Sequence, residues 1–479
     1  MDDVSTPDWV KDAVFYQIFP DRFAKSGRLV KPTNLQKWGE KPTFHAFQGG
    51  DLLGVAENLD YLTDLGITAI YFNPVFASTA NHRYHTHDFF AIDPLLGGQP
   101  AFAEMLAAAH KRGIRVIFDG VFNHASRGFY QFNHLLESGQ ESPYVDWFHV
   151  YQWPVNAYAE HQRPNYAAWW NLHALPKLNT DNPAVRQFLW SVGTYWLEQG
   201  IDGWRLDVPG EIDDDDFWRE FRCRCRAINP EAYIVGEFWD EAQRWLKGDQ
   251  FDGQMNYLFT RIAFGFCGGH NLNQSDSVHT GLKYMPALNG HQFARALEHL
   301  HQLYHPEIVQ AQLNMLSSHD MPRLMTIANY DVSTVNLMFL LQMTIAGAPN
   351  IYYGDEVGLT GGRDPDCRRA FPWHDEESWN QGLRANVRRY IALRKANPAL
   401  RRGDFRVLHE SGQVVVFSRQ YGQQVAVVAL NVGFGEESFS PAGPWPNPLP
   451  DGLDEAGSPL VVGQEMKIGA RSGRVWLNS

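Results

Sequence analysis

Cysteine is scarce in this sequence. The 479 residues include only four, Cys223, Cys225, Cys267 and Cys367, and no two of them have C-x-x-C spacing. A disulfide framework is therefore not expected, and a reducing compartment fits this usage better than an oxidising one. The chain also lacks a basic N-terminal segment followed by an apolar stretch, and no uncharged apolar run approaches transmembrane length. We expect a soluble, cytoplasmic protein without a membrane partner.

Positive charge is not concentrated anywhere along the chain. The formal net charge is −13 and no long Lys/Arg cluster occurs, which argues against a nucleic-acid partner and against an anionic membrane surface. Hydrophobic residues make up 44% and charged residues 20%, as in an ordinary globular protein. The length suits one large domain with appendages or roughly two to three domains. None of these features indicates an oligomeric state.

Short β-branched and aromatic runs alternate with longer helical patterns, which is typical of repeated βα units around a parallel sheet. The runs predict strands at 14–19, 69–74, 115–121, 203–208, 233–238, 251–257, 313–320 and 350–356. The helical patterns lie at 101–112, 184–199, 334–346 and 383–396. This order predicts an α/β fold of the (β/α)8 TIM-barrel type. A doubly wound open sheet is the alternative, although no G-x-G-x-x-G motif follows an early strand.

Two segments interrupt this alternation. Residues 125–175 are loop-rich and aromatic, and a structureless loop of that length is unusual, so we expect a small inserted subdomain after the third strand. After about residue 400 the helical pattern gives way to strand-like runs, which predicts a C-terminal antiparallel β-sandwich domain over 401–479. The barrel would then comprise 1–124 and 176–400.

Polar side chains stand at the carboxyl ends of four predicted strands, where a (β/α)8 barrel carries its active site. These groups are Asp119, Asn123, His124, Arg205, Asp207, Glu237, His319 and Asp320. Any one of them alone is better explained as part of a structural ion pair or a helix cap. Carboxylates, histidines and an arginine at four strand ends together favour a catalytic site.

Three acids without a metal-binding motif are typical of glycoside chemistry. A retaining glycosidase needs a carboxylate nucleophile and a protonated carboxylic acid about 5–5.5 Å apart. Neighbouring strands lie about 4.7–4.9 Å apart, so Asp207 and Glu237 can meet this requirement at their ends. Arg205 shares a strand face with Asp207 and would keep it ionised, while low solvation and neighbouring negative charge would keep the proton on Glu237. The aromatic run NYAAWWNLH at 165–173 is interpreted as a sugar-stacking platform.

The ordered motifs DGVFNH, GWRLDVPGE, VGEFW and SSHD resemble the four signature regions of the α-amylase superfamily (glycoside hydrolase family 13). YFNPVF and YYGDE add to this resemblance, which runs from about residue 12 to 400. LPKLN at 175–179, ANHRYHTHDFF, GDQFDGQMNY and GGRDPDCRR are similar to the branch containing neopullulanase, cyclomaltodextrinase and maltogenic amylase. The resemblance implies a retaining hydrolase of α-1,4 bonds in maltooligosaccharides, cyclodextrins, pullulan or starch, acting through a covalent glycosyl-enzyme intermediate without a cofactor.

The resemblance also implies roles for individual residues. Asp207 would be the nucleophile, Glu237 the general acid and base, and Asp320 the residue that distorts and steadies the substrate ring. The residues that would bind substrate are His82, Tyr84, His124, Arg205, His319, Asp364 and Arg368. Tyr84 would stack beneath the sugar that donates the cleaved bond (subsite −1), with His82 beside it. Asp364 and Arg368, at the two ends of DPDCR, would hold the next sugar.

Three departures from that branch change the expectations. Its members usually carry an N-terminal β domain that forms a dimer, whereas here the barrel begins almost at once. Relatives typically read Val-Ala-Asn-Glu after the nucleophile, but this chain reads VPGE at 208–211, which should alter contacts with the leaving-group sugar. Relatives often bind calcium just after FPDRFA through Asn and Asp. Here KSGR at 25–28 lacks such ligands, so we predict no calcium there, and none at Asn123.

Other interpretations of single motifs are weaker. The imidazoles of HRYHTHD at 82–88 could hold zinc, but the motif lacks H-E-x-x-H spacing and a cysteine partner. The acids of EIDDDDFW at 211–218 are better explained as capping a helix start than as a calcium loop. Two other functions are alternatives, a transglycosylating α-glucanotransferase and a non-catalytic carbohydrate-binding relative. The presence of all three acids argues against the second, and the balance between hydrolysis and transfer stays open.

Overall fold

A closed parallel barrel forms the main body of the computed structural model, which describes residues 4–443, 445, 448–454 and 456–478. In that part of the chain eight strands form one parallel sheet in the order β8-β7-β6-β5-β2-β1-β10-β9. They are β1 (Phe15–Ile18), β2 (Ala69–Phe72), β5 (Arg115–Gly120), β6 (Gly203–Leu206), β7 (Tyr233–Gly236), β8 (Gly253–Gln254), β9 (Leu313–Met315) and β10 (Ala348–Tyr352). A parallel bridge between Met255 and Leu313 joins the two ends of the sheet. The predicted (β/α)8 barrel is confirmed.

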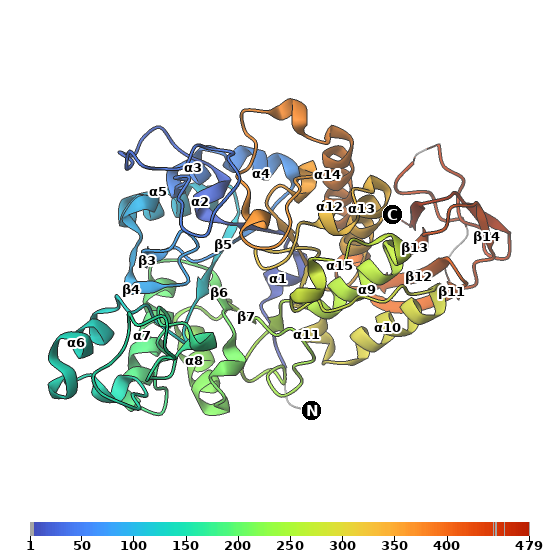
Figure 1. Ribbon diagram of the computed structural model, residues 1–479. Coiled ribbons are helices and arrows are strands. Elements are labelled where there is room, and N and C mark those ends of the chain that lie inside the picture. Colours follow the sequence, from blue (N-terminus) through green and yellow to red (C-terminus); the bar gives the residue numbers. More distant parts are fainter. Residues whose placement is uncertain (1–3, 444, 446–447, 455, 479) are drawn as a thin grey trace.

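Helices surround the barrel and connect its strands (Figure 1). The longer ones are α5 (Gly98–Lys111), α7 (Pro183–Glu198), α8 (Asp215–Ile228), α9 (Tyr257–Cys267), α10 (Gly290–Gln302), α13 (Val332–Thr344) and α14 (Gln381–Ala396). The shorter ones are α1 (Asp8–Asp12), α2 (Pro20–Phe23), α3 (Leu52–Glu57), α4 (Leu59–Leu65), α11 (Pro306–Gln310), α12 (Leu324–Ile327) and α15 (Pro398–Arg402). Asp214 caps α8 by accepting a hydrogen bond from the Phe217 N–H at 3.0 Å, as the capping interpretation of the acidic run predicts. Among the described residues, no helix combines the length and the apolar character that crossing a bilayer requires.

The segment between β5 and α7 folds into short elements of its own. It contains α6 (Tyr130–Ser138), and antiparallel bridges such as that between Ala168 and Pro176 hold it together. A hairpin of β3 (Phe76–Ser78) and β4 (Thr86–Ile92) precedes α5. In Figure 1, α6 (teal) lies at the opposite end of the molecule from the C-terminal sheet (red). The limits 125–175 for an inserted subdomain, and 1–124 with 176–400 for the barrel, stay a prediction.

The C-terminal region forms an antiparallel sheet with two buried faces. Its strands are β11 (Asp404–Glu410), β12 (Val414–Tyr421), β13 (Gln424–Asn431) and β16 (Ser472–Leu477), paired in that order. Along β12, Val415 and Phe417 join the core shared with the barrel, whereas Val414 and Val416 join a second core. The hairpin of β14 (Glu437–Phe439) and β15 (Met466–Ile468) covers that second core. A C-terminal antiparallel β domain is confirmed, and its limits 401–479 stay a prediction.

Candidate active site

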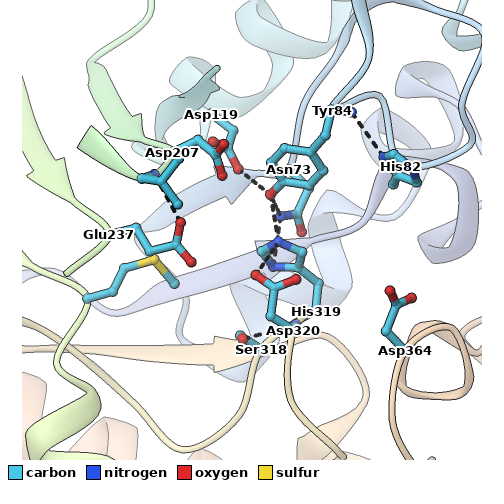
Figure 2. A network of polar contacts seen from close by, with 12 residues as sticks. Asn73, His82, Tyr84, Asp119, Asp207, Glu237, Ser318, His319, Asp320 and Asp364 are labelled. Atoms are coloured by element: carbon cyan, nitrogen blue, oxygen red, sulfur yellow. Dashed lines mark hydrogen bonds and ion pairs between the residues drawn. The ribbon is translucent and has the colours of Figure 1, made fainter. Parts of the chain in front are cut away.

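The acids predicted at the ends of the fourth and fifth barrel strands lie together. β6 and β7 pair in parallel, and the register continues beyond them because the Glu237 N–H donates to the Leu206 carbonyl at 3.0 Å. Asp207 and Glu237 therefore follow neighbouring strands at the same level of the barrel. Figure 2 shows their side chains next to each other, with Asp320 close by.

One guanidinium group contacts three carboxyl groups at this end of the barrel. Arg205 is fully buried, and its Nη1 donates to Asp119 at 2.7 Å and to Asp207 at 3.0 Å. Its Nη2 lies 3.0 Å from Glu237, and its Nε donates to the sulfur of Met255 at 3.2 Å. Burial opposes the charge, but Asp119 and Glu237 outweigh it and raise the pKa of Arg205 well above its ordinary value. Arg205 is therefore a permanent cation between the acids.

Burial controls the protonation of Asp207 and Glu237. It raises the pKa of Glu237, and it raises the pKa of Asp207 as well, where the negative charge of Glu237 adds to the effect. We expected Arg205 to keep Asp207 ionised, but in this site burial and Glu237 outweigh its attraction while both acids are charged. The two acids thus titrate as one unit, and a single proton on the pair removes their repulsion.

His319 and Tyr84 connect the acids to the barrel interior. The Tyr84 hydroxyl donates to Asp119 at 2.7 Å and lies 2.6 Å from Nε2 of His319, and the two rings are nearly parallel. Nδ1 of His319 lies 2.9 Å and 3.1 Å from the side-chain amide nitrogens of Gln17 and Asn73. Because those amide groups donate, Nδ1 accepts, and Nε2 carries a ring proton next to the Tyr84 hydroxyl.

Asp320 lies on the other side of the acid pair. Its carboxylate is 3.0 Å from His319 Nε2 and 3.4 Å from Nη2 of Arg368, which also binds Asp364 at 2.8 Å. Burial would raise the pKa of Asp320, but His319 and Arg368 reverse this and lower it below its ordinary value. Burial raises the pKa of Asp364 although Arg368 opposes the shift. Asp320 is therefore a stable anion beside two acids whose pKa values are raised.

The two remaining predicted histidines border the same site. Nδ1 of His82 accepts from the Tyr84 N–H at 3.1 Å, and Nε2 of His124 lies 3.3 Å from the Tyr84 carbonyl. Burial lowers the pKa of both imidazoles, to about 3 for His124. Both rings are thus neutral near pH 7 and can exchange hydrogen bonds with hydroxyl groups without adding charge.

Several groups of this network were not predicted from the sequence. They are Gln17, Tyr71, Asn73, Val208, Trp239 and Met255. Gln17 and Asn73 did carry a signal, a polar side chain within or directly after a buried strand, whereas the apolar Met255 carried none. Val208 has a φ of +34°, which is rare for a β-branched residue, and its N–H donates to Glu237 at 3.1 Å. The turn after Asp207 therefore directs a backbone amide at Glu237.

The segment after FPDRFA contains the ammonium group of Lys31, and its residues do not form a site suited to calcium. The buried Asp51 accepts hydrogen bonds from the N–H and the hydroxyl of Ser26 and from the Gly54 N–H, and Nζ of Lys31 lies 3.0 Å from its carboxylate. Nζ of Lys31 also donates to the Leu95 carbonyl at 2.7 Å. This cation already balances the carboxylate, so the residues do not fit a calcium ion. In the described ranges, no three or more His, Cys, Asp or Glu side chains are placed to hold a metal.

Removal of divalent cations is therefore expected to change neither activity nor melting temperature. By contrast, Lys31→Met should lower the free energy of unfolding by about 1–3 kcal/mol, because it leaves the Asp51 carboxylate buried without its counter-charge. Thermal unfolding of the unaltered protein and of Lys31→Met, each with and without EDTA, measures these effects on stability. Lys25→Met, which changes an exposed lysine of the same segment, is the control. A clear loss of activity or stability of the unaltered protein in EDTA would contradict the assignment.

Comparisons with known proteins agree with this geometry. The family model "Alpha amylase, catalytic domain" matches residues 17–401. A cyclomaltodextrinase from Geobacillus thermopakistaniensis is 43% identical over 429 residues, which are 89% of this chain and 69% of that protein. The crystal structure of Ttha1563 from Thermus thermophilus has a TM-score of 0.93 at 45% identity and covers 98% of this chain and 100% of its own. The native debranching enzyme of Nostoc punctiforme has a TM-score of 0.90 at 46% identity, with 99% of each chain covered.

Proposed function

Since this chain belongs to the α-amylase family of glycoside hydrolases, we propose that it hydrolyses α-1,4-glucosidic bonds in maltooligosaccharides, cyclodextrins and pullulan with retention of configuration. One observation carries the proposal: Asp207 and Glu237 follow adjacent barrel strands and share the guanidinium of Arg205. A nucleophile and an acid held beside one another are what a retaining mechanism requires. The names of the similar proteins, a cyclomaltodextrinase and a debranching enzyme, support the substrate class.

In the first step we assign the attack on C1 of the substrate to the carboxylate of Asp207. The bond between C1 and the glycosidic oxygen breaks as the ester to Asp207 forms, and Glu237 gives its proton to the departing oxygen. In the second step a water molecule attacks C1, Glu237 takes its proton, and Asp207 is released. The proton shared by the buried acid pair supports this exchange of roles, because Glu237 must be an acid first and a base afterwards.

The remaining residues are assigned to binding. Asp320, an anion near the acid pair, suits the positive charge that develops on the sugar ring in the transition state. Tyr84, the neutral rings of His82 and His124, and His319 border the pair and suit the hydroxyl groups and the apolar face of the sugar in subsite −1. The Asp364–Arg368 ion pair lies beyond Asp320 and is assigned to the next sugar.

We also assign the enzyme to the cytoplasm. Its cysteines Cys223, Cys225, Cys267 and Cys367 are all free thiols, and Cys223 is exposed. Free thiols, one of them at the surface, suit a reducing compartment.

Product analysis tests the proposed function. Maltotriose, a cyclodextrin, pullulan and soluble starch are each incubated with the enzyme, and ¹H NMR follows the anomeric protons from the first minutes. The α-anomer is expected to form first and then to equilibrate with the β-anomer, because two displacements at C1 restore the configuration. Initial release of the β-anomer would contradict the retaining assignment. Absence of product from all four glucans would contradict the function itself.

A further inference from the structure

A tryptophan that the catalytic network does not use stands at the surface near the site. Trp170 is 77% exposed, and its ring lies next to that of Trp169, with centroids 5.3 Å apart and planes 22° from parallel. Trp169 in turn lies parallel to the buried ring of His124, at a centroid distance of 6.2 Å. Three rings therefore lead from the catalytic site to the surface of the inserted segment.

The backbone holds Trp170 there in an unfavourable conformation. Its φ is +50° and that of Asn171 is +57°, so two consecutive residues other than glycine are left-handed. Hydrogen bonds from the Trp169 N–H to the Leu175 carbonyl and from the Leu172 N–H to the Trp169 carbonyl, both 2.9 Å, close the loop tightly. Neither core packing nor backbone preference stabilises this exposed indole, and strain of this kind gathers at ligand-binding sites.

The space beside the loop is polar and open. Asn171 lines a cavity of about 410 Å³, whose other polar walls include His149, Tyr151 and the Lys177–Glu211 ion pair. A glucose unit combines an apolar face of C–H bonds with a rim of hydroxyl groups. The flat face of an indole suits the former, and amide, imidazole and charged side chains suit the latter.

We propose that the exposed face of Trp170 is a stacking platform for a glucose unit that lies beyond the sugars at the cleaved bond. This inference rests on the proposed function and deepens it, because it makes Trp170 a determinant of preference for long α-glucan chains. A chain too short to reach from the acid pair to the surface of the loop gains nothing from the platform.

The test compares two substrates on matched variants. For Trp170→Ala, the ratio of kcat/KM on maltoheptaose to kcat/KM on maltotriose is expected to fall about 3- to 10-fold, because one aromatic stacking contact is lost. The change should lie mainly in KM. Trp170→Phe, which keeps a flat ring, should restore most of the ratio. Trp170→Gly should lower the ratio too, but with a melting temperature no lower than that of the unaltered protein, because glycine accepts the left-handed backbone. Tyr130→Ala is the control, since Tyr130 is an exposed aromatic of the same segment whose ring neighbours are His134 and Tyr144.

Calorimetric titration of maltoheptaose into Glu237→Gln, with and without Trp170→Ala, separates the two proposals. Weaker binding in the double variant supports the platform even if the unaltered protein cleaves none of the glucans. An unchanged ratio and unchanged affinity would overturn the platform while leaving the catalytic assignment intact. Equal losses on both substrate lengths would also overturn it, since they would show that Trp170 only maintains the fold around His124.

Discussion

Asp207→Asn is expected to lower kcat on maltotriose by at least about 10⁴-fold, because an amide cannot form the ester to C1. The substitution keeps the shape of the side chain and an oxygen for Arg205, so that circular dichroism and melting temperature should change little. Asp216→Asn, which alters an exposed acid on α8, is the matched control and should keep full activity. Near-normal turnover of Asp207→Asn would show that another group attacks C1.

The corresponding change at the second acid has a different signature. Glu237→Gln should lower kcat on maltotriose by about 10²–10⁴-fold, the usual contribution of a general acid. On α-maltosyl fluoride, whose leaving group needs no proton, this loss should be much smaller, whereas Asp207→Asn should lose as much as before. Equal losses for both variants on both substrates would contradict the division of roles.

The pH dependence gives the same assignment a second measurement. Burial raises the pKa of Glu237, so the acid keeps its proton to a higher pH than an exposed glutamate, and kcat/KM should fall on the alkaline side only when the pair loses that proton. Glu237→Gln should lack this alkaline decline. If kcat/KM of Glu237→Gln declined at the same alkaline pH as that of the unaltered protein, the decline would belong to another group.

Arg419→Met is expected to lower the free energy of unfolding by about 3–5 kcal/mol, because it leaves several buried carbonyl groups without donors at about 1–3 kcal/mol each. Arg419 is fully buried on β12 and donates to the carbonyls of Thr344, Leu400 and Gly403 at 2.7, 3.0 and 2.8 Å. Arg394 from α14 donates to the same Leu400 carbonyl at 3.0 Å. Burial lowers the pKa of both guanidinium groups to about 9. The two side chains join the ends of barrel helices to the C-terminal sheet, so methionine would leave buried carbonyls without donors.

Denaturant unfolding measures this effect. Arg406→Met is the control, because Arg406 is exposed on the adjacent strand β11 and its loss should change stability by no more than about 0.5 kcal/mol. Turnover per folded molecule should stay unchanged in both variants, since the junction lies away from the acid pair. Equal stability of the two variants would contradict the role given to Arg419.

Much of the barrel was predictable because its strands are buried on both faces and appear as short apolar runs between helices. The ends of the strands were less predictable. The strand predicted over 313–320 ends at Met315 in the structure, as β9. It ends there because the chain leaves the sheet to bring His319 into the site. β10 begins at Ala348, before the predicted start, because its pairing with β9 extends the sheet across Pro349 despite the missing N–H.

The juxtaposition of Asp207 and Glu237 was predictable because barrel topology brings the ends of consecutive strands together. Their electrostatics were not, since these depend on contacts between residues far apart in sequence. The link between Arg205 and Asp119 spans 86 positions, and that between Gln17 and His319 spans 302. For the same reason the sequence did not indicate that burial would raise the pKa of Asp207 against the attraction of Arg205.

Trapping the glycosyl-enzyme intermediate tests whether Asp207 forms the covalent bond to C1 of the substrate. The enzyme is incubated with a fluorinated α-glucosyl fluoride that forms the glycosyl-enzyme quickly and hydrolyses slowly, and the digested protein is sequenced by mass spectrometry. One added sugar is expected on the peptide that contains Asp207, and none in Asp207→Asn. A sugar on any other side chain, or turnover of the reagent without a covalent adduct, would contradict this role of Asp207.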